Sequence, residues 1–214
     1  MSPQPKAEIP RANWWQRQFA RALAAENASP RPEYERRKRA LLGDLSGTVL
    51  EIGPGPATNL TYYAPDVRWI GLEPNPAMFP YIEEAAQQLG RAVELHPGHA
   101  EEIPLGDASV DAVVGTLVLC SVDDPAQVLR EVRRVLKPGG RYVFIEHVAA
   151  PRQSLLRRVQ AIIRPVWKAV GDGCTLNRET WATIEQAGFS EVQIEHFRLP
   201  VPIYSPHIAG AAVK

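Results

Sequence analysis

The chain has 214 residues, of which 45% are hydrophobic and 22% charged, and its formal net charge is +0. This length suits one α/β domain with its own core. The balanced charge disfavours binding to nucleic acid or an anionic membrane, because no global field attracts either. No apolar run reaches the roughly 18–20 residues of a membrane span, and residues 1–10 lack the apolar segment of a signal peptide.

The chain has two cysteines, Cys120 and Cys174, which do not form a disulfide framework or a metal site. We therefore expect no metal, reduced thiols and a cytoplasmic protein without stable membrane insertion. A monomer and a homodimer both remain compatible with the sequence.

Two helices are expected before the main pattern begins. Residues 11–27 carry apolar side chains that include Trp15 and Phe19, and residues 33–42 form a more charged helix beyond the break at Pro30. We predict that residues 1–44 are an N-terminal helical extension. It either packs on a sheet edge or covers the ligand cleft as a lid.

Strands and helices alternate over residues 45–214, which we assign to one domain. The expected strands are 48–52, 67–73, 92–96, 110–119, 141–147, 192–199 and 208–213. The expected helices are 58–64, 76–89, 125–136, 154–170 and 178–187. No crossover helix separates the last two strands, so they should pair antiparallel. The pattern predicts a doubly wound, Rossmann-like α/β fold, with a seven-stranded, mostly parallel sheet, an antiparallel final strand and helices on both faces.

A glycine turn with Gly53 and Gly55 follows the first strand, and Glu73 ends the second. This layout is typical of a nucleoside-binding βαβ unit, in which glycine lets the backbone approach the ligand and the acid accepts hydrogen bonds from ribose. Thr58 stands where a dinucleotide fingerprint has its third glycine. The site therefore lacks the phosphate cradle of a dehydrogenase, which makes a nicotinamide-binding oxidoreductase the weaker hypothesis.

Several segments in the expected order resemble the class I S-adenosylmethionine (SAM)-dependent methyltransferases, over roughly residues 45–214. They are 51–55, Glu73, 98–105, 111–119 and 136–140. The resemblance implies SAM as the cofactor. The contacts it implies come from Glu51, Gly53, Gly55, Glu73, Pro74, His99, Ala100, Glu101 and Leu117. His99 stands where the family commonly has an adenine-contacting acid, so either His99 or Glu101 takes that role.

A narrower resemblance links segments 117–122, 144–150, 172–181 and 206–214 to the small methyltransferase-like group, of the methyltransferase type 11 kind, that includes alkyl thiol S-methyltransferases. It implies a small apolar acceptor, with a thiol favoured. An N- or O-methyltransferase of a lipid, quinone or secondary metabolite is the enzymatic alternative. A protein that binds SAM or S-adenosylhomocysteine without catalysis is the alternative of another class.

His147 and Asp172 are the candidate catalytic residues. His147 ends the fifth strand at the ligand-binding edge of the sheet, where it could act as a base or orient the acceptor. Asp172 could orient His147 or bind an amine. The structural alternatives are a histidine bonded to backbone and an Asp-Gly turn.

Six further residues are candidates for substrate contact. They are Trp15, Phe19, Cys120, Cys174, Arg178 and His207. Core packing is the alternative for the aromatic residues, and burial as small apolar side chains is the alternative for the cysteines. Arg178 is expected in the first turn of helix 178–187, an unfavourable place for a cation, which suggests a partner such as Asp172 or an acidic substrate.

Overall fold

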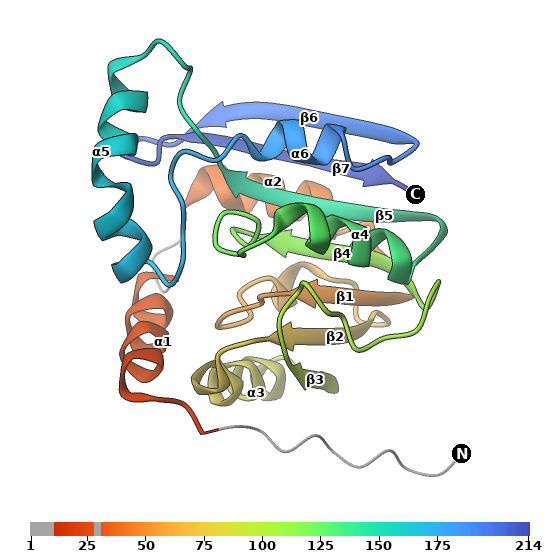
Figure 1. Cartoon of the computed structure of the whole chain (residues 1–214). Helices are drawn as coiled ribbons and strands as arrows, with labels where there is room; N and C mark the ends of the chain where they lie inside the picture. Colours follow the sequence, from red (N-terminus) through yellow and green to blue (C-terminus); the bar gives the residue numbers. More distant parts are fainter. Residues whose placement is uncertain (1–10, 28–30) are drawn as a thin grey trace.

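The structure is a computed structural model that describes residues 11–27 and 31–214 (Figure 1). The sequence features noted at residues 1–10 and at Pro30 lie outside the described residues. The strands are β1 (Thr48–Ile52), β2 (Arg68–Glu73), β3 (Val93–Pro97), β4 (Val110–Thr116), β5 (Leu136–His147), β6 (Glu191–Arg198) and β7 (Pro206–Val213). The α-helices are α1 (Trp14–Asn27), α2 (Pro32–Leu42), α3 (Phe79–Gln88), α4 (Pro125–Val135), α5 (Leu155–Val170) and α6 (Thr180–Glu185).

The strands form one seven-stranded sheet in the order β3-β2-β1-β4-β5-β7-β6. Strands β1 to β5 pair in parallel, and β7 runs antiparallel to both of its neighbours, β5 and β6. This topology confirms the predicted doubly wound fold and its antiparallel final strand. The strand order reverses between β1 and β4, which is the place where such sheets bind ligands.

Apolar side chains that alternate along the strands build a core on each face of the sheet. Leu50 and Ile52 of β1 point to one face, which α4 and α6 cover, whereas Val49 points to the other, which α2 and α3 cover. Figure 1 shows α4 and α6 in front of the sheet and α2 behind it. Helices therefore cover both faces, as the sequence predicted.

The start of α4 follows the capping signal in the sequence. Asp124 is the N-cap, its carboxylate accepts a 3.0 Å hydrogen bond from the backbone N–H of Gln127, and Pro125 takes the first helical position. A cap of this kind stabilises a helix by about 1 kcal/mol.

Several boundaries differ from those expected. The expected helix 58–64 is a 3-10 turn (η1) at Leu60–Tyr62, because the backbone at Ala57 is left-handed and the following N–H groups bond three residues back. Strand β4 ends at Thr116 rather than at 119, because Leu117 also adopts a left-handed conformation, with φ +60°.

In the C-terminal half, the expected helix 178–187 shortens to α6, because the Arg178 carbonyl instead accepts the N–H of Ala149. Helix α5 runs without a break through Pro165.

The carboxyl ends of β1, β2, β4 and β5 meet at one edge of the sheet. Helices α1 and α5 lie at the left of Figure 1, α5 above α1, on the side to which the arrows of the parallel strands point. Among the described helices, none has the length and apolar character needed to cross a membrane. The edge next to α1 and α5 is where the predicted site residues gather.

Candidate functional site

Unusual backbone conformations mark the carboxyl edge of the sheet. Three of the four described non-glycine residues with positive φ angles, Ala57, Leu117 and Asp172, lie in the loops after β1, β4 and α5, and the fourth, Ala108, lies before β4. Such conformations cost of order 1–3 kcal/mol each and concentrate at functional sites. The loops that carry the first three are those in which the sequence predicted ligand-binding residues.

The glycine turn after β1 has the left-handed backbone that its sequence predicted, with φ +57° at Gly53 and +55° at Gly55. A Cβ added to Gly53 would lie 2.9 Å from Cγ2 of Val118, in the turn after β4. Only glycine therefore allows these two turns to pack together at the switch point of the sheet.

Glu73 closes this turn from the end of β2. Its Oε2 accepts the N–H of Gly55 at 3.0 Å, and its Oε1 accepts the N–H of Asn75 at 2.9 Å. Burial raises the pKa of Glu73 to about 7, although both N–H groups favour the charged form. A carboxylate has about four acceptor positions, so two stay available for a pair of hydroxyl donors. The ribose of SAM supplies such a pair, and these residues fit it.

Glu51 lies beneath the turn, fully buried. Its carboxylate accepts hydrogen bonds from Asn59 Nδ2 at 2.8 Å, Tyr63 Oη at 2.7 Å and Trp69 Nε1 at 2.9 Å. Burial raises its pKa, and these three donors oppose that shift. The carboxylate thus joins the end of β1 to the segment around η1 and to β2, and its predicted contact with the cofactor stays a prediction.

The loop after β3 carries the residues predicted to meet adenine. Ala100 is buried and His99 is exposed. The Glu101 carboxylate accepts the backbone N–H of Asp123 at 3.0 Å, which ties this loop to the start of α4. Glu101 is therefore already engaged, and His99 is the member of the pair whose side chain faces outward.

The remaining predicted cofactor contacts, Pro74 and Leu117, lie at the same edge. Pro74 is exposed directly after Glu73, and Leu117 is 38% exposed in the turn after β4. Both are placed where a ligand at the switch point could contact them.

Helix α1 packs over the cofactor loops. Asn75 Nδ2 donates to the carbonyl of Gln16 at 3.1 Å, and Leu23 Cδ2 lies 3.3 Å from the position of a Cβ on Gly55. Phe19 is partly buried against the core on the face of the sheet that α2 and α3 cover, whereas Trp15 is 42% exposed. The helix therefore joins Phe19 to the core and leaves Trp15 at the surface.

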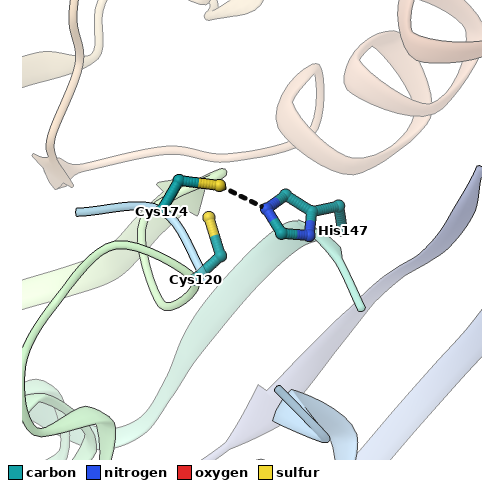
Figure 2. A group of neighbouring side chains, drawn as sticks. All are labelled: Cys120, His147 and Cys174. Carbon is teal, nitrogen blue, oxygen red and sulfur yellow. Dashed lines mark hydrogen bonds between the residues drawn. The ribbon is translucent and has the colours of Figure 1, made fainter. Parts of the chain in front are cut away.

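His147, Cys120 and Cys174 come together at the ends of β4 and β5. His147 Nε2 lies 2.8 Å from Cys174 Sγ, and the Sγ of Cys120 faces both (Figure 2). The neighbouring thiol of Cys120 lowers the pKa of Cys174, and that of Cys174 raises the pKa of Cys120; His147 adds to the first effect. Trp167 Nε1 donates to Cys174 Sγ at 3.2 Å. The sequence did not anticipate that the two cysteines meet.

Three predicted site residues make contacts other than those expected. Within residues 11–27 and 31–214, no hydrogen bond joins Asp172 to His147. Burial raises the pKa of Asp172, and His99 opposes that shift. Cys174 contacts the imidazole instead, and the role of Asp172 in orienting His147 stays a prediction.

Arg178 hydrogen-bonds to the turn after β4 and not to Asp172, its predicted partner. Its Nη1 donates to the carbonyl of Leu119 and, at 2.9 Å, to the carbonyl of Val122. His207 is buried among aromatic rings, where its Nε2 is 2.7 Å from Tyr34 Oη and burial lowers its pKa to about 4. Both side chains support the site from within the fold, and a direct substrate contact of either one stays a prediction.

Glu146 is a residue that the sequence analysis missed. It is fully buried, and its carboxylate accepts the backbone N–H groups of Val118, Leu119 and Cys120 at 2.9, 2.8 and 3.3 Å. Burial raises its pKa to about 7. An acid at the end of the apolar run of β5 was the signal that could have revealed it.

Comparisons with known proteins agree with this geometry. Residues 50–144 match the family model described as a methyltransferase domain. The chain is 41% identical over 213 residues to thiol S-methyltransferase TMT1B of Homo sapiens, covering 92% of this chain and 86% of that protein.

Solved structures extend the likeness of the fold. A SAM-dependent methyltransferase from Thermotoga maritima, described as a possible histamine N-methyltransferase, has a TM-score of 0.62 at 23% identity, covering 94% and 99% of the two chains. The [4+2]-cyclase SpnF has a TM-score of 0.71 at 15% identity, covering 98% and 99%. Because a cyclase shares the architecture, the fold alone does not define the reaction. The match to the methyltransferase domain and the 41% identity over 92% of the chain together show that the chain belongs to the SAM-dependent methyltransferase family.

Proposed function

We propose that this enzyme transfers the methyl group of SAM to the thiol of a small apolar acceptor. The observation that carries the proposal is the 41% identity, over nearly the whole chain, to a relative named thiol S-methyltransferase. A second relative, thiol S-methyltransferase TMT1A of Homo sapiens, is 39% identical over 179 residues.

The apolar character of the acceptor is supported by a groove beside the sulfur cluster. The groove has a volume of about 420 Å³ and is lined by Ile162, Ile163, Val166, Trp167, Val170 and Ile203. Its Trp167 also donates to Cys174 Sγ. An apolar side chain could therefore occupy the groove while its reacting atom points toward Cys174 and His147.

The chemistry of a thiol acceptor suits these residues. SAM supplies an activated methyl group on a sulfonium, and its departing thioether is neutral. An unperturbed thiol ionises near pH 8.5, about two units closer to neutrality than the ammonium of lysine, so only modest help is required. His147 at the end of β5 can hold or accept the thiol proton, and the main task of the site is alignment.

We also propose that residues 1–44 act as a lid, with a covering role for α1. The contacts of Leu23 and Gln16 with the cofactor loops support this role. Two free thiols in contact suit a reducing compartment, so we place the enzyme in the cytoplasm, as a monomer or homodimer without a nucleic-acid partner.

The acceptor is tested by offering the purified chain isotope-labelled SAM with matched alkyl thiols, amines and phenols, and identifying products by mass. We expect the labelled methyl group on thiols, with turnover rising as the alkyl chain lengthens to fill the groove. Turnover confined to amines or phenols would contradict the thiol assignment.

Glu73→Ala is the matched control for this experiment, because it removes the proposed ribose acceptor without touching Cys120, His147 or Cys174. Its thiol turnover should fall and should recover in part at high SAM concentration. If thiol methylation is independent of SAM concentration in both the unchanged protein and Glu73→Ala, the product comes from a background reaction and not from the enzyme.

A further inference from the structure

Three soft metal ligands converge on one point at the acceptor side of the site. The ligand atoms of Cys120, His147 and Cys174 all lie within 4.8 Å of one another, and Figure 2 shows the sulfur of Cys174 directed toward the imidazole and the sulfur of Cys120 directed toward that of Cys174. They come from the turn after β4, the end of β5 and the loop after α5. The fold therefore assembles a two-thiol, one-imidazole group from distant parts of the sequence.

This ligand set is specific in its chemistry. Thiolate and imidazole together favour zinc, whereas magnesium and calcium prefer oxygen ligands. Zn–S bonds of about 2.3 Å and Zn–N bonds of about 2.0 Å separate tetrahedral ligand atoms by about 3.5–3.8 Å. In the present structure Nε2 of His147 and Sγ of Cys174 are 2.8 Å apart, and no pair of the three ligand atoms is separated by more than 4.8 Å.

The backbone brings the two cysteine segments into close contact. The N–H of Thr175 donates to the carbonyl of Cys120 at 2.8 Å. Gly173 has φ +87°, and a Cβ at that position would lie 2.8 Å from the carbonyl oxygen of Ser121. A larger residue would separate the segments, so the glycine maintains the approach of the two sulfurs.

The ligands are also held by surrounding groups, as metal ligands usually are. Glu146 accepts the backbone N–H of Cys120, and Trp167 donates to Cys174 Sγ. Cys120 and His147 are buried, whereas Cys174 is partly exposed. A ligand can therefore reach the group from the side of Cys174, next to the apolar groove that Trp167 lines.

We propose that Cys120, His147 and Cys174 bind one zinc ion and that its fourth position takes the sulfur of the acceptor. The second part rests on the proposed thiol methylation. With His147 bound to zinc, the acceptor thiol releases its proton to solvent and not to the imidazole, because a thiol bound to zinc is deprotonated. Its sulfur then forms the new S–C bond, the methyl–sulfonium bond breaks, and that electron pair goes to the departing thioether. The methylated product is a neutral thioether and a weaker ligand, so it can leave.

The test uses the full chain purified with a non-thiol, non-chelating reductant. Zinc content is measured by mass spectrometry, and zinc is then replaced by cobalt(II), whose absorption reports thiolate ligands and tetrahedral geometry. We expect one metal per chain and a thiolate-to-cobalt charge-transfer band. Fully reduced protein that takes up neither metal would overturn the proposal.

Variants assign the ligands. Cys174→Ser and His147→Asn should each weaken zinc binding by about 10–100-fold or more. Changes to residues that only support a metal ligand typically cost that much, and these two variants remove the ligands themselves. His96→Asn is the matched control, because His96 pairs with Glu94 on β3, away from the cluster, and should leave metal binding unchanged. If the buried Cys120→Ser variant fails to fold, the cobalt spectrum of the unmodified protein still decides the outcome. Equal zinc affinity in all variants would overturn the assignment.

Activity separates this proposal from the proposed function. Thiol methylation that is lost on chelation and restored by zinc would support both. Unchanged thiol methylation by protein shown to be metal-free would overturn the acceptor role of zinc and leave the proposed function standing. Stoichiometric zinc in a protein that methylates amines but no thiol would overturn the thiol assignment and the acceptor role, while the metal site stands.

Discussion

The Glu73 carboxylate accepts a 3.0 Å hydrogen bond from the backbone N–H of Gly55. The acid that ends β2 thus orders the glycine turn after β1, while part of its hydrogen-bonding capacity stays available. The turn and the proposed ribose contact are therefore coupled through one side chain. A change at Glu73 should alter both the shape of the cofactor site and its affinity.

Glu73→Gln should weaken SAM binding by about 10- to 100-fold. The amide loses the charge of the acceptor and offers one acceptor oxygen where the acid offers two, and hydrogen bonds to charged groups contribute about 1.5–3 kcal/mol. Titration calorimetry measures the affinity. Glu84→Gln, at an exposed position on α3, is the control and should bind as the unchanged protein does. Equal affinity in both variants would remove Glu73 from the site.

The raised pKa of Glu73, to about 7 against an ordinary 4.5, predicts opposite pH effects on stability and on binding. Burial is the main cause; Asp172 and Glu51 add to it, and the N–H groups of Asn75 and Gly55 oppose it. Because the folded pKa is raised, the stability contribution is fully present below pH about 4.5 and is lost as pH rises through about 7. SAM affinity should rise over the same window, because ribose hydroxyls donate to the ionised acid.

This prediction is checked by measuring the melting temperature of the unliganded protein from pH about 4.5 to 8. SAM affinity is measured at both ends of the same pH range. Glu73→Gln cannot ionise, so its stability and its SAM affinity should both vary less with pH. A variant with the same pH slopes as the unchanged protein would assign them to another group.

The order of elements and the cofactor side of the site could be predicted because their signals are local. A glycine turn after an apolar strand, an acid at the next strand end and the Asp124-Pro125 cap each depend on short segments. Boundaries were missed where tertiary contacts decide them, as at Leu117, whose left-handed backbone ends β4 early.

The acceptor side could not be predicted in the same way, because its geometry depends on contacts between distant segments. Cys120 and Cys174 are separated in sequence by α4, β5 and α5, and only the folded chain joins them. Glu146 was missed for a related reason. Its role depends on the backbone N–H groups of a turn in another part of the chain.

The covering role of α1 predicts that Leu23→Asp weakens SAM binding by about five- to tenfold. The change places a charge where Leu23 now contacts the Gly55 turn, and loss of a partly buried leucine contact costs about 1 kcal/mol or more. Arg21→Ala, at an exposed position on the same helix, is the control. Hydrogen exchange should also show that SAM protects the amides of α1. Exchange in α1 that SAM leaves unaltered would contradict the lid.

Arg178→Met should destabilise the turn that carries Cys120. The guanidinium now donates to the carbonyls of Leu119 and Val122, and the thioether side chain leaves both without that partner. The expected loss is about 2–4 kcal/mol, which corresponds to a fall in melting temperature of about 4–16 °C for a chain of this size. Arg158→Met, on the exposed side of α5, is the control. SAM affinity should change little, because Glu73 and Gly53 keep their contacts, whereas acceptor turnover should fall. An unchanged melting temperature together with a raised KM for acidic acceptors would instead make Arg178 a substrate-binding residue, as its position near a helix N-terminus first suggested.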